Sequence, residues 1–93
     1  MLNKENKELC YKVLTKYGIL HQRNMVIEEC AELQKAVCKL FREDTLAHRD
    51  NFLEELVDVI VVIEQMLLVE RLPMDEVNEM ARIKLERALK DEH

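Results

Sequence analysis

The chain has 93 residues, of which 48% are hydrophobic and 35% charged, with a single glycine and a single proline. This length allows one domain, residues 1–93, and the composition is that of a compact helical protein, which argues against a disordered chain. The net charge of −5 argues against a protein that binds the phosphate backbone of nucleic acids. An acidic chain of this kind would handle phosphates through a metal ion or a few placed cations.

Two features bear on the compartment. The first residues, MLNKENKEL, lack the apolar stretch of a signal peptide, and charged side chains interrupt the most apolar segment, so we expect no membrane partner. The three cysteines, Cys10, Cys30 and Cys38, form no CxxC pair and are expected to be reduced thiols in the core. The chain is therefore expected to be cytoplasmic.

Four segments with helical spacing follow one another along the chain. In chain order they span roughly residues 3–17, 20–42, 46–71 and 73–90. Gly18 closes the first, Asp44 or Thr45 is the expected N-cap of the third, and the third stops before Pro73. No strand alternation is present, so the sequence predicts an all-α, four-helix bundle-like protomer.

The third segment is unusually apolar. Between Phe52 and Val69, 13 of the 18 residues are apolar, and they surround nearly the whole helix. A helix that is apolar all round must be buried on most sides, which a monomer of this size does not easily provide. We therefore expect this helix to be central and to assemble the protomers into a dimer or tetramer.

Acidic residues lie on faces of the second and third helices that should pack. On a helical wheel, Glu29 falls inside the apolar arc of the second helix, Glu32 at its edge and Glu28 just outside it. In the third helix, Glu55 is flanked by apolar residues on both sides, and Asp58 lies one turn away. If the two faces meet, the carboxylates converge, and each pair at 4 Å repels by about 4 kcal/mol.

A divalent cation would remove this repulsion. Ligands that are all oxygen atoms favour a hard ion, Mg²⁺, with Mn²⁺ as a substitute. Glutamate is common in the chain, at 14 of 93 residues, so the same motifs can also be read as solvated helix faces. Their position on the apolar arcs of two different helices favours a metal site.

The fourth helix carries cations in or beside its apolar stripe. Lys84 lies midway along the stripe and Arg87 borders it. A lysine in this position can simply pack its stem and extend its ammonium group to water. Beside an acidic metal cluster, such cations can instead hold the phosphates of a substrate.

Together these motifs resemble a known family. EECAE, followed after 22 residues by ELVD, is similar to the EExxE…ExxD signature of the MazG-like, all-α NTP pyrophosphohydrolases. YGILHQRNMVIEECAELQKAV and EELVDVIVVIEQM resemble the two metal helices of that family, down to Gln22 and Gln65. RIKLERAL resembles its late Asn-x-Lys-x-x-Arg pattern, although Arg82 stands at the Asn position. The resemblance covers about residues 17–90.

The resemblance implies an enzyme that hydrolyses a nucleoside triphosphate between the α and β phosphates, yielding a monophosphate and pyrophosphate with Mg²⁺ as cofactor. It also implies a homodimer or homotetramer. Carried over by position, the metal ligands would be Glu29, Glu32, Glu55 and Asp58, the catalytic helper of the attacking water Glu28, and the phosphate-binding residues Lys84 and Arg87.

Two alternatives stay open at the level of sequence. Phosphoribosyl-ATP pyrophosphohydrolase, of the same superfamily, shares the acidic motifs, so the motifs do not separate it from a general NTP pyrophosphohydrolase. A non-enzymatic helical dimerisation or binding module would carry the same acids as solvated faces. The four aromatic residues are candidates for stacking on a base, and the sequence singles out none of them.

Overall fold

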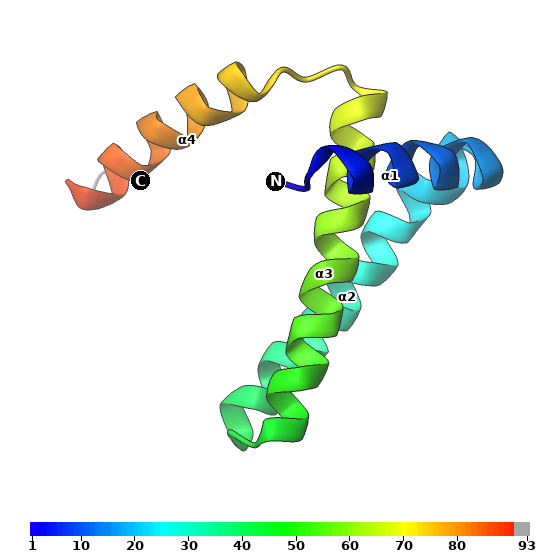
Figure 1. Ribbon diagram of the computed structural model, residues 1–93. Helices are drawn as coiled ribbons and strands as arrows, with labels where there is room; N and C mark the ends of the chain where they lie inside the picture. The colour runs from blue at the N-terminus through cyan, green and yellow to red at the C-terminus, as the bar shows by residue number, and fades with distance from the viewer. Residues whose placement is uncertain (91–93) are drawn as a thin grey trace.

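The structure, a computed structural model, describes residues 1–90, and these form four α-helices and no β-strand (Figure 1). In chain order the helices are α1 (Lys4–Tyr17), α2 (Ile19–Arg42), α3 (Leu46–Val69) and α4 (Met74–Leu89). The predicted all-α class is confirmed, and each helix begins and ends within two residues of its predicted bounds. Among the described residues, no helix is both long enough and apolar enough to cross a membrane.

A single glycine joins α1 to α2. Gly18 has φ 91°, a conformation that costs glycine little and that other residues rarely adopt. Its N–H donates a hydrogen bond to the Leu14 carbonyl at 2.8 Å, which caps the end of α1. At the other end of α1, the side chain of Asn3 accepts a hydrogen bond from the Asn6 N–H at 2.8 Å. The connection between the two helices is therefore a sharp, one-residue turn.

The α2–α3 connection settles which residue caps α3. The Thr45 hydroxyl accepts a hydrogen bond from the His48 N–H at 3.1 Å, so Thr45 is the N-cap. Asp44, the other candidate, forms an ion pair with Arg49 through two hydrogen bonds of 2.6 and 2.8 Å. With so short a connection, α2 and α3 form an antiparallel hairpin and pack against each other along it (Figure 1).

α1 crosses the end of this hairpin where α2 begins and α3 ends (Figure 1). The core is small: within residues 1–90, the buried apolar side chains are those of Cys10, Leu14, Ala36 and Val62. Of the three cysteines expected in the core, only Cys10 is buried, whereas Cys30 is half-buried and Cys38 exposed. The prediction was wrong for Cys38 because its side chain lies on the solvent face of α2.

Buried amides tie α1 to the hairpin. Gln65 is 0% exposed, and its carbonyl oxygen accepts a hydrogen bond from the Gln22 amide at 2.8 Å. The Gln65 amide donates in turn to the main-chain carbonyl of Cys10 at 3.1 Å. Because these buried amide groups are paired, the network fixes the crossing of the three helices at little desolvation cost.

Glu64 anchors the first residues of the chain in a similar way. Its buried carboxylate accepts a hydrogen bond from the Leu2 N–H at 2.7 Å and pairs with the terminal ammonium of Met1 at 3.1 Å. Burial by itself would raise the pKa of Glu64, but the Leu2 N–H and the ammonium outweigh it and lower the pKa. The carboxylate is therefore held in its charged form beside the residues that precede α1.

α3 contacts both α1 and α2, in keeping with the predicted central position, but its apolar surface is only partly covered. Side chains such as Leu53, Val57 and Leu68 are exposed. Within residues 1–90, α4 makes no packing contact with the other three helices (Figure 1). The four helices therefore do not close into a bundle within one chain.

The turn between α3 and α4 is held by hydrogen bonds of its own. The Leu72 N–H donates to the Leu67 carbonyl at 3.1 Å, and the Arg71 N–H donates to the Leu68 carbonyl at 3.3 Å. With Arg71 at φ 53°, this is a Schellman motif, and Pro73 directly follows it. The motif ends α3, and the extended backbone at Pro73 leads into α4.

Candidate metal centre

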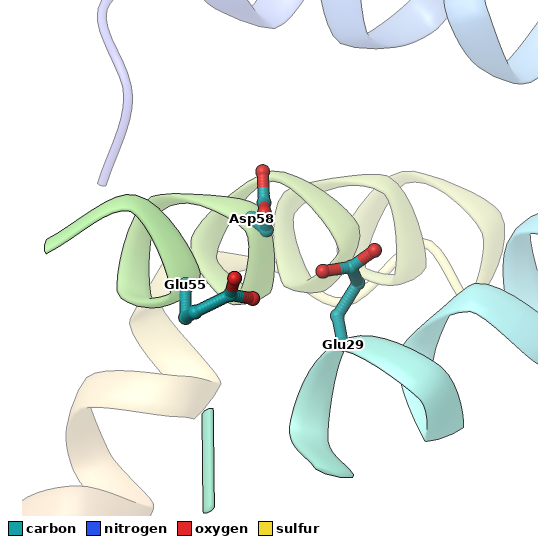
Figure 2. A group of neighbouring side chains, drawn as sticks. All are labelled: Glu29, Glu55 and Asp58. Atoms are coloured by element: carbon teal, nitrogen blue, oxygen red, sulfur yellow. The ribbon is translucent and has the colours of Figure 1, made fainter. Parts of the chain in front are cut away.

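Three carboxylates from two helices meet halfway along the hairpin. Glu29 comes from α2, and Glu55 and Asp58 come from α3; one oxygen atom from each lies within 4.8 Å of the others. Figure 2 shows Glu29 reaching from its helix toward the two α3 side chains. Glu55 and Asp58 share a face because residues three apart are neighbours on a helix. Glu29 and Glu55 are half-buried, while Asp58 is exposed.

The electrostatics of the cluster are unfavourable for three negative charges. Burial of the Glu29 carboxylate and the nearby charges of Asp58 and Glu55 raise its pKa, and the charge of Glu28 adds to this. Within residues 1–90, the three carboxylates form no ion pair with a lysine or arginine. The cluster therefore carries negative charge that no ion pair from the described part of the chain neutralises.

The other two predicted acids of α2 lie outside this cluster. Glu32 is exposed, and its carboxylate forms an ion pair with Lys35 on the same helix at 3.5 Å. Glu28 is exposed too, but it lies near enough to Glu29 for its charge to raise the pKa of that residue. The structure thus brings together three of the five predicted acids and leaves Glu28 and Glu32 facing solvent.

The predicted phosphate-binding cations are not at the cluster. Lys84 and Arg87 are exposed on α4, which does not pack against α2 or α3. Arg82, between them and the start of α4, is engaged on its own helix with Glu79 and Glu86. Within one chain, the acidic and basic halves of the predicted site are therefore separate.

A cleft of about 440 Å³ adjoins the cluster, and Glu29 and Asp58 form part of its lining. The lining also includes Tyr17, one of the four aromatic candidates for stacking on a base, and two residues that the sequence did not mark, His21 and Met25. A signal for two of them was present, because Met25 and His21 precede Glu29 by four and eight residues and so share its helix face.

Two aromatic rings stand together in this lining. The Tyr17 and His21 rings stack with centroids 5.2 Å apart and an interplanar angle of 24°. His21 Nδ1 lies 2.7 Å from the Gln22 side-chain oxygen, whose amide group donates to Gln65. Since the chain of hydrogen bonds ends at a main-chain carbonyl, which only accepts, His21 Nδ1 must be the donor. The network therefore fixes both the tautomer and the orientation of the ring.

The donor set of the cluster is suited to a hard divalent cation. All three side chains offer carboxylate oxygens, which are the ligands preferred by Mg²⁺ and Mn²⁺, and their mutual repulsion is relieved by a positive ion. Glu29, Glu55 and Asp58 are the residues that could hold such an ion. In comparisons with known proteins, no family model, curated protein or solved structure matches the chain.

Proposed function

We propose that the chain is a Mg²⁺-dependent nucleoside triphosphate pyrophosphohydrolase, active on a canonical or modified (d)NTP. Water would add across the anhydride between the α and β phosphates, giving a monophosphate and pyrophosphate. The observation that carries the proposal is the convergence of Glu29 from α2 with Glu55 and Asp58 from α3, beside a cleft. The order and spacing of the acidic motifs, which resemble the MazG-like family, support the same reaction.

Four carboxylates would hold the metal. Glu29, Glu55 and Asp58 already face one another, and Glu32 lies one turn beyond Glu29. The exposed Glu32–Lys35 pair is a weak, solvent-screened contact, so Glu32 is free to turn toward the others. Bound Mg²⁺, or Mn²⁺ in its place, would supply charge neutralisation for the phosphates and activation of water.

The remaining roles fall to residues around the carboxylates. Glu28 is exposed beside Glu29, where it can orient or deprotonate the attacking water. Lys84 and Arg87 would contact the phosphates of the substrate. We further propose a homodimer or homotetramer assembled through α3, because much of the apolar surface of this helix is open.

The cleft beside the cluster is large enough for a nucleoside. Its volume of about 440 Å³ lies within the range of roughly 300–1,000 Å³ that small-molecule sites occupy. Tyr17 and His21 offer a stacked aromatic surface, and Met25 and Val61 an apolar one. Of the aromatic candidates in the sequence, Tyr17 is the one that lines this cleft.

The direct test is incubation of the purified chain with Mg²⁺ and a panel of canonical and modified nucleotides, with phosphoribosyl-ATP included. We expect a monophosphate and pyrophosphate in equal amounts from at least one NTP. Glu29→Gln and Asp58→Asn should each reduce turnover by at least about 100-fold while the protein stays folded. Glu54→Gln, which removes an exposed carboxylate next to Glu55, is the matched control and should leave turnover unchanged.

The panel also separates the alternatives. Hydrolysis of phosphoribosyl-ATP and of no other nucleotide would indicate that the chain is a phosphoribosyl-ATP pyrophosphohydrolase. Folded protein that releases no pyrophosphate from any nucleotide, with circular dichroism confirming its helices, would contradict the proposal and favour a helical binding module.

A further inference from the structure

One chain leaves more surface exposed than a monomer of its mass should. A compact protein of 11.1 kDa exposes about 5,700 Å², whereas this chain exposes 7513 Å². Its radius of gyration is 15.6 Å, against about 12 Å for a compact chain of this length. The excess of about 1,800 Å² per chain suits an extensive interface, since a standard one buries about 800 Å² on each partner.

α4 contributes much of this excess. Its apolar stripe runs through Val77, Ala81 and Leu85, with Met80 and Leu89 at the two edges, and Leu85 and Leu89 are 65% and 87% exposed. A helix of 16 residues with such a stripe is stabilised mainly by packing, because isolated helices of this length are marginal in water. A surface that covers the stripe is therefore needed, and within residues 1–90 the chain places none against it.

An apolar groove of about 330 Å³ between α1 and α3 is the complementary surface. Leu9 from α1, 50% exposed, and Val57 from α3 are among the side chains that line it. Val13 and Val61 line both this groove and the cleft beside the acidic cluster. A helix lying in the groove would therefore lie next to the carboxylates.

The cations of α4 and their positions along the helix fit α4 as the occupant of this groove. Lys84 and Arg87 lie in and beside the stripe and form no ion pair within residues 1–90, while the acidic cluster lacks a cation. Lys84 follows the start of α4 by 10 residues, which is about 15 Å along the helix axis. Asp58 precedes the end of α3 by 11 residues, which is about 16.5 Å. When the start of α4 lies level with the end of an antiparallel α3, Lys84 comes level with Asp58.

The turn at residues 70–73 favours an α4 from another chain. For α4 to fold back on its own α3, the backbone of residues 72–73, which leads α4 away from α3, would have to reverse its direction (Figure 1). Docking on a second copy keeps the observed direction of α4, and reciprocal exchange of one element is a low-cost route to a symmetric dimer.

We propose that α4 of one copy docks in the α1–α3 groove of a second copy, so that Lys84 and Arg87 of the partner subunit complete the acidic site. Each site would then be shared between two chains, one giving the carboxylates and the other the phosphate-binding cations. The sharing rests on the proposed function, because the cations act there on substrate phosphates. The docking itself is a separate physical claim.

The sharing is tested by mixing two inactive variants. Glu29→Gln removes the acidic half and Lys84→Gln the basic half, and neither alone should turn over substrate. Unfolding and refolding them together in equal amounts gives about one half mixed dimers, each with one intact site. About one quarter of the wild-type activity should return. An active wild-type chain whose variants never complement each other would overturn the sharing and place both halves in one chain.

The docking is tested without any activity. Leu85→Asp on the stripe and Val57→Asp in the groove should each convert the dimer to monomers in sedimentation at fixed concentration. Phe41→Asp is the control: Phe41 is 90% exposed at the α2–α3 link, away from the groove, and its replacement should leave the dimer intact. Dimers that survive both Leu85→Asp and Val57→Asp would overturn the docking.

The two experiments fail in different ways. An inactive wild-type chain that still dimerises through α4 contradicts the proposed function and the sharing, and leaves the docking standing. An active wild-type chain whose mixed variants show no activity contradicts the sharing of the site and leaves the proposed function standing.

Discussion

Glu29 combines partial burial with three carboxylate neighbours, and its raised pKa expresses the resulting repulsion. The folded state therefore disfavours the charged form of this residue relative to the unfolded chain. Between the ordinary value of 4.5 and the raised pKa, the folded protein binds more protons than the unfolded one. Stability consequently falls as the pH rises through this window.

Glu29→Gln should therefore stabilise the metal-free protein at neutral pH and have little effect below pH 4.5. Each kcal/mol of relieved repulsion raises Tm by about 4–8 °C for a domain of this size. Thermal unfolding in EDTA, followed by circular dichroism between pH 4 and 8, measures the difference. Glu54→Gln controls for the loss of one negative charge and should show no such trend. A Glu29→Gln protein that is no more stable than Glu54→Gln at pH 7 would contradict the repulsion.

Helical periodicity distinguished Glu29 from the other two acids of α2 but did not decide which of the three reach the cluster. The wheel placed Glu29 in the apolar arc, and the structure finds it half-buried among the α3 carboxylates. Glu32, at the edge of the arc, turns instead toward Lys35. A wheel records the direction of each Cβ, whereas the position of a long carboxylate depends on rotamer and neighbours. The sequence could not supply these.

At the level of elements, the helix-breaking residues of the sequence were sufficient to place the ends of the helices. Gly18 and Pro73 each mark a boundary, because one tolerates positive φ and the other lacks an N–H. The burial of Glu64 and Gln65 was not predictable in this way, since it depends on α1 crossing α3 at that point. The separation of α4 was not predictable either: an amphipathic pattern shows that a face must be covered and not which chain covers it.

The turn between α3 and α4 gives a prediction at this scale. Arg71 adopts φ 53°, where a residue with a Cβ costs about 1 kcal/mol relative to glycine. Arg71→Gly should therefore stabilise the end of α3 and raise Tm by about 4–8 °C. Arg71→Gln keeps the strain and removes the charge, so it serves as the control and should unfold near the wild-type temperature. Equal Tm values for the two variants would show that the Schellman motif carries no strain.

At the scale of the whole molecule, the exposed apolar stripe of α4 and the unneutralised carboxylates of the acidic cluster can be resolved together. Within residues 1–90, no other helix covers the apolar stripe of α4, and no lysine or arginine pairs with the acidic cluster. A second copy can provide the cover and two cations, while a divalent ion can neutralise the carboxylates. Both would bind the folded state in preference to the unfolded one and so add to its stability.

Metal binding should therefore be visible in thermal unfolding at constant protein concentration, with or without a substrate. At a metal concentration one hundred times Kd, the added stability is about 2.7 kcal/mol, which is a rise of more than 10 °C for a domain of this size. Titration with Mn²⁺ and Mg²⁺ from micromolar to millimolar measures it. Asp58→Asn should lose most of the rise, because it removes one carboxylate from the cluster, and Glu54→Gln should keep it. Equal shifts in both variants would assign the rise to general charge screening, and no shift at millimolar metal would rule against a metal centre at Glu29, Glu55 and Asp58.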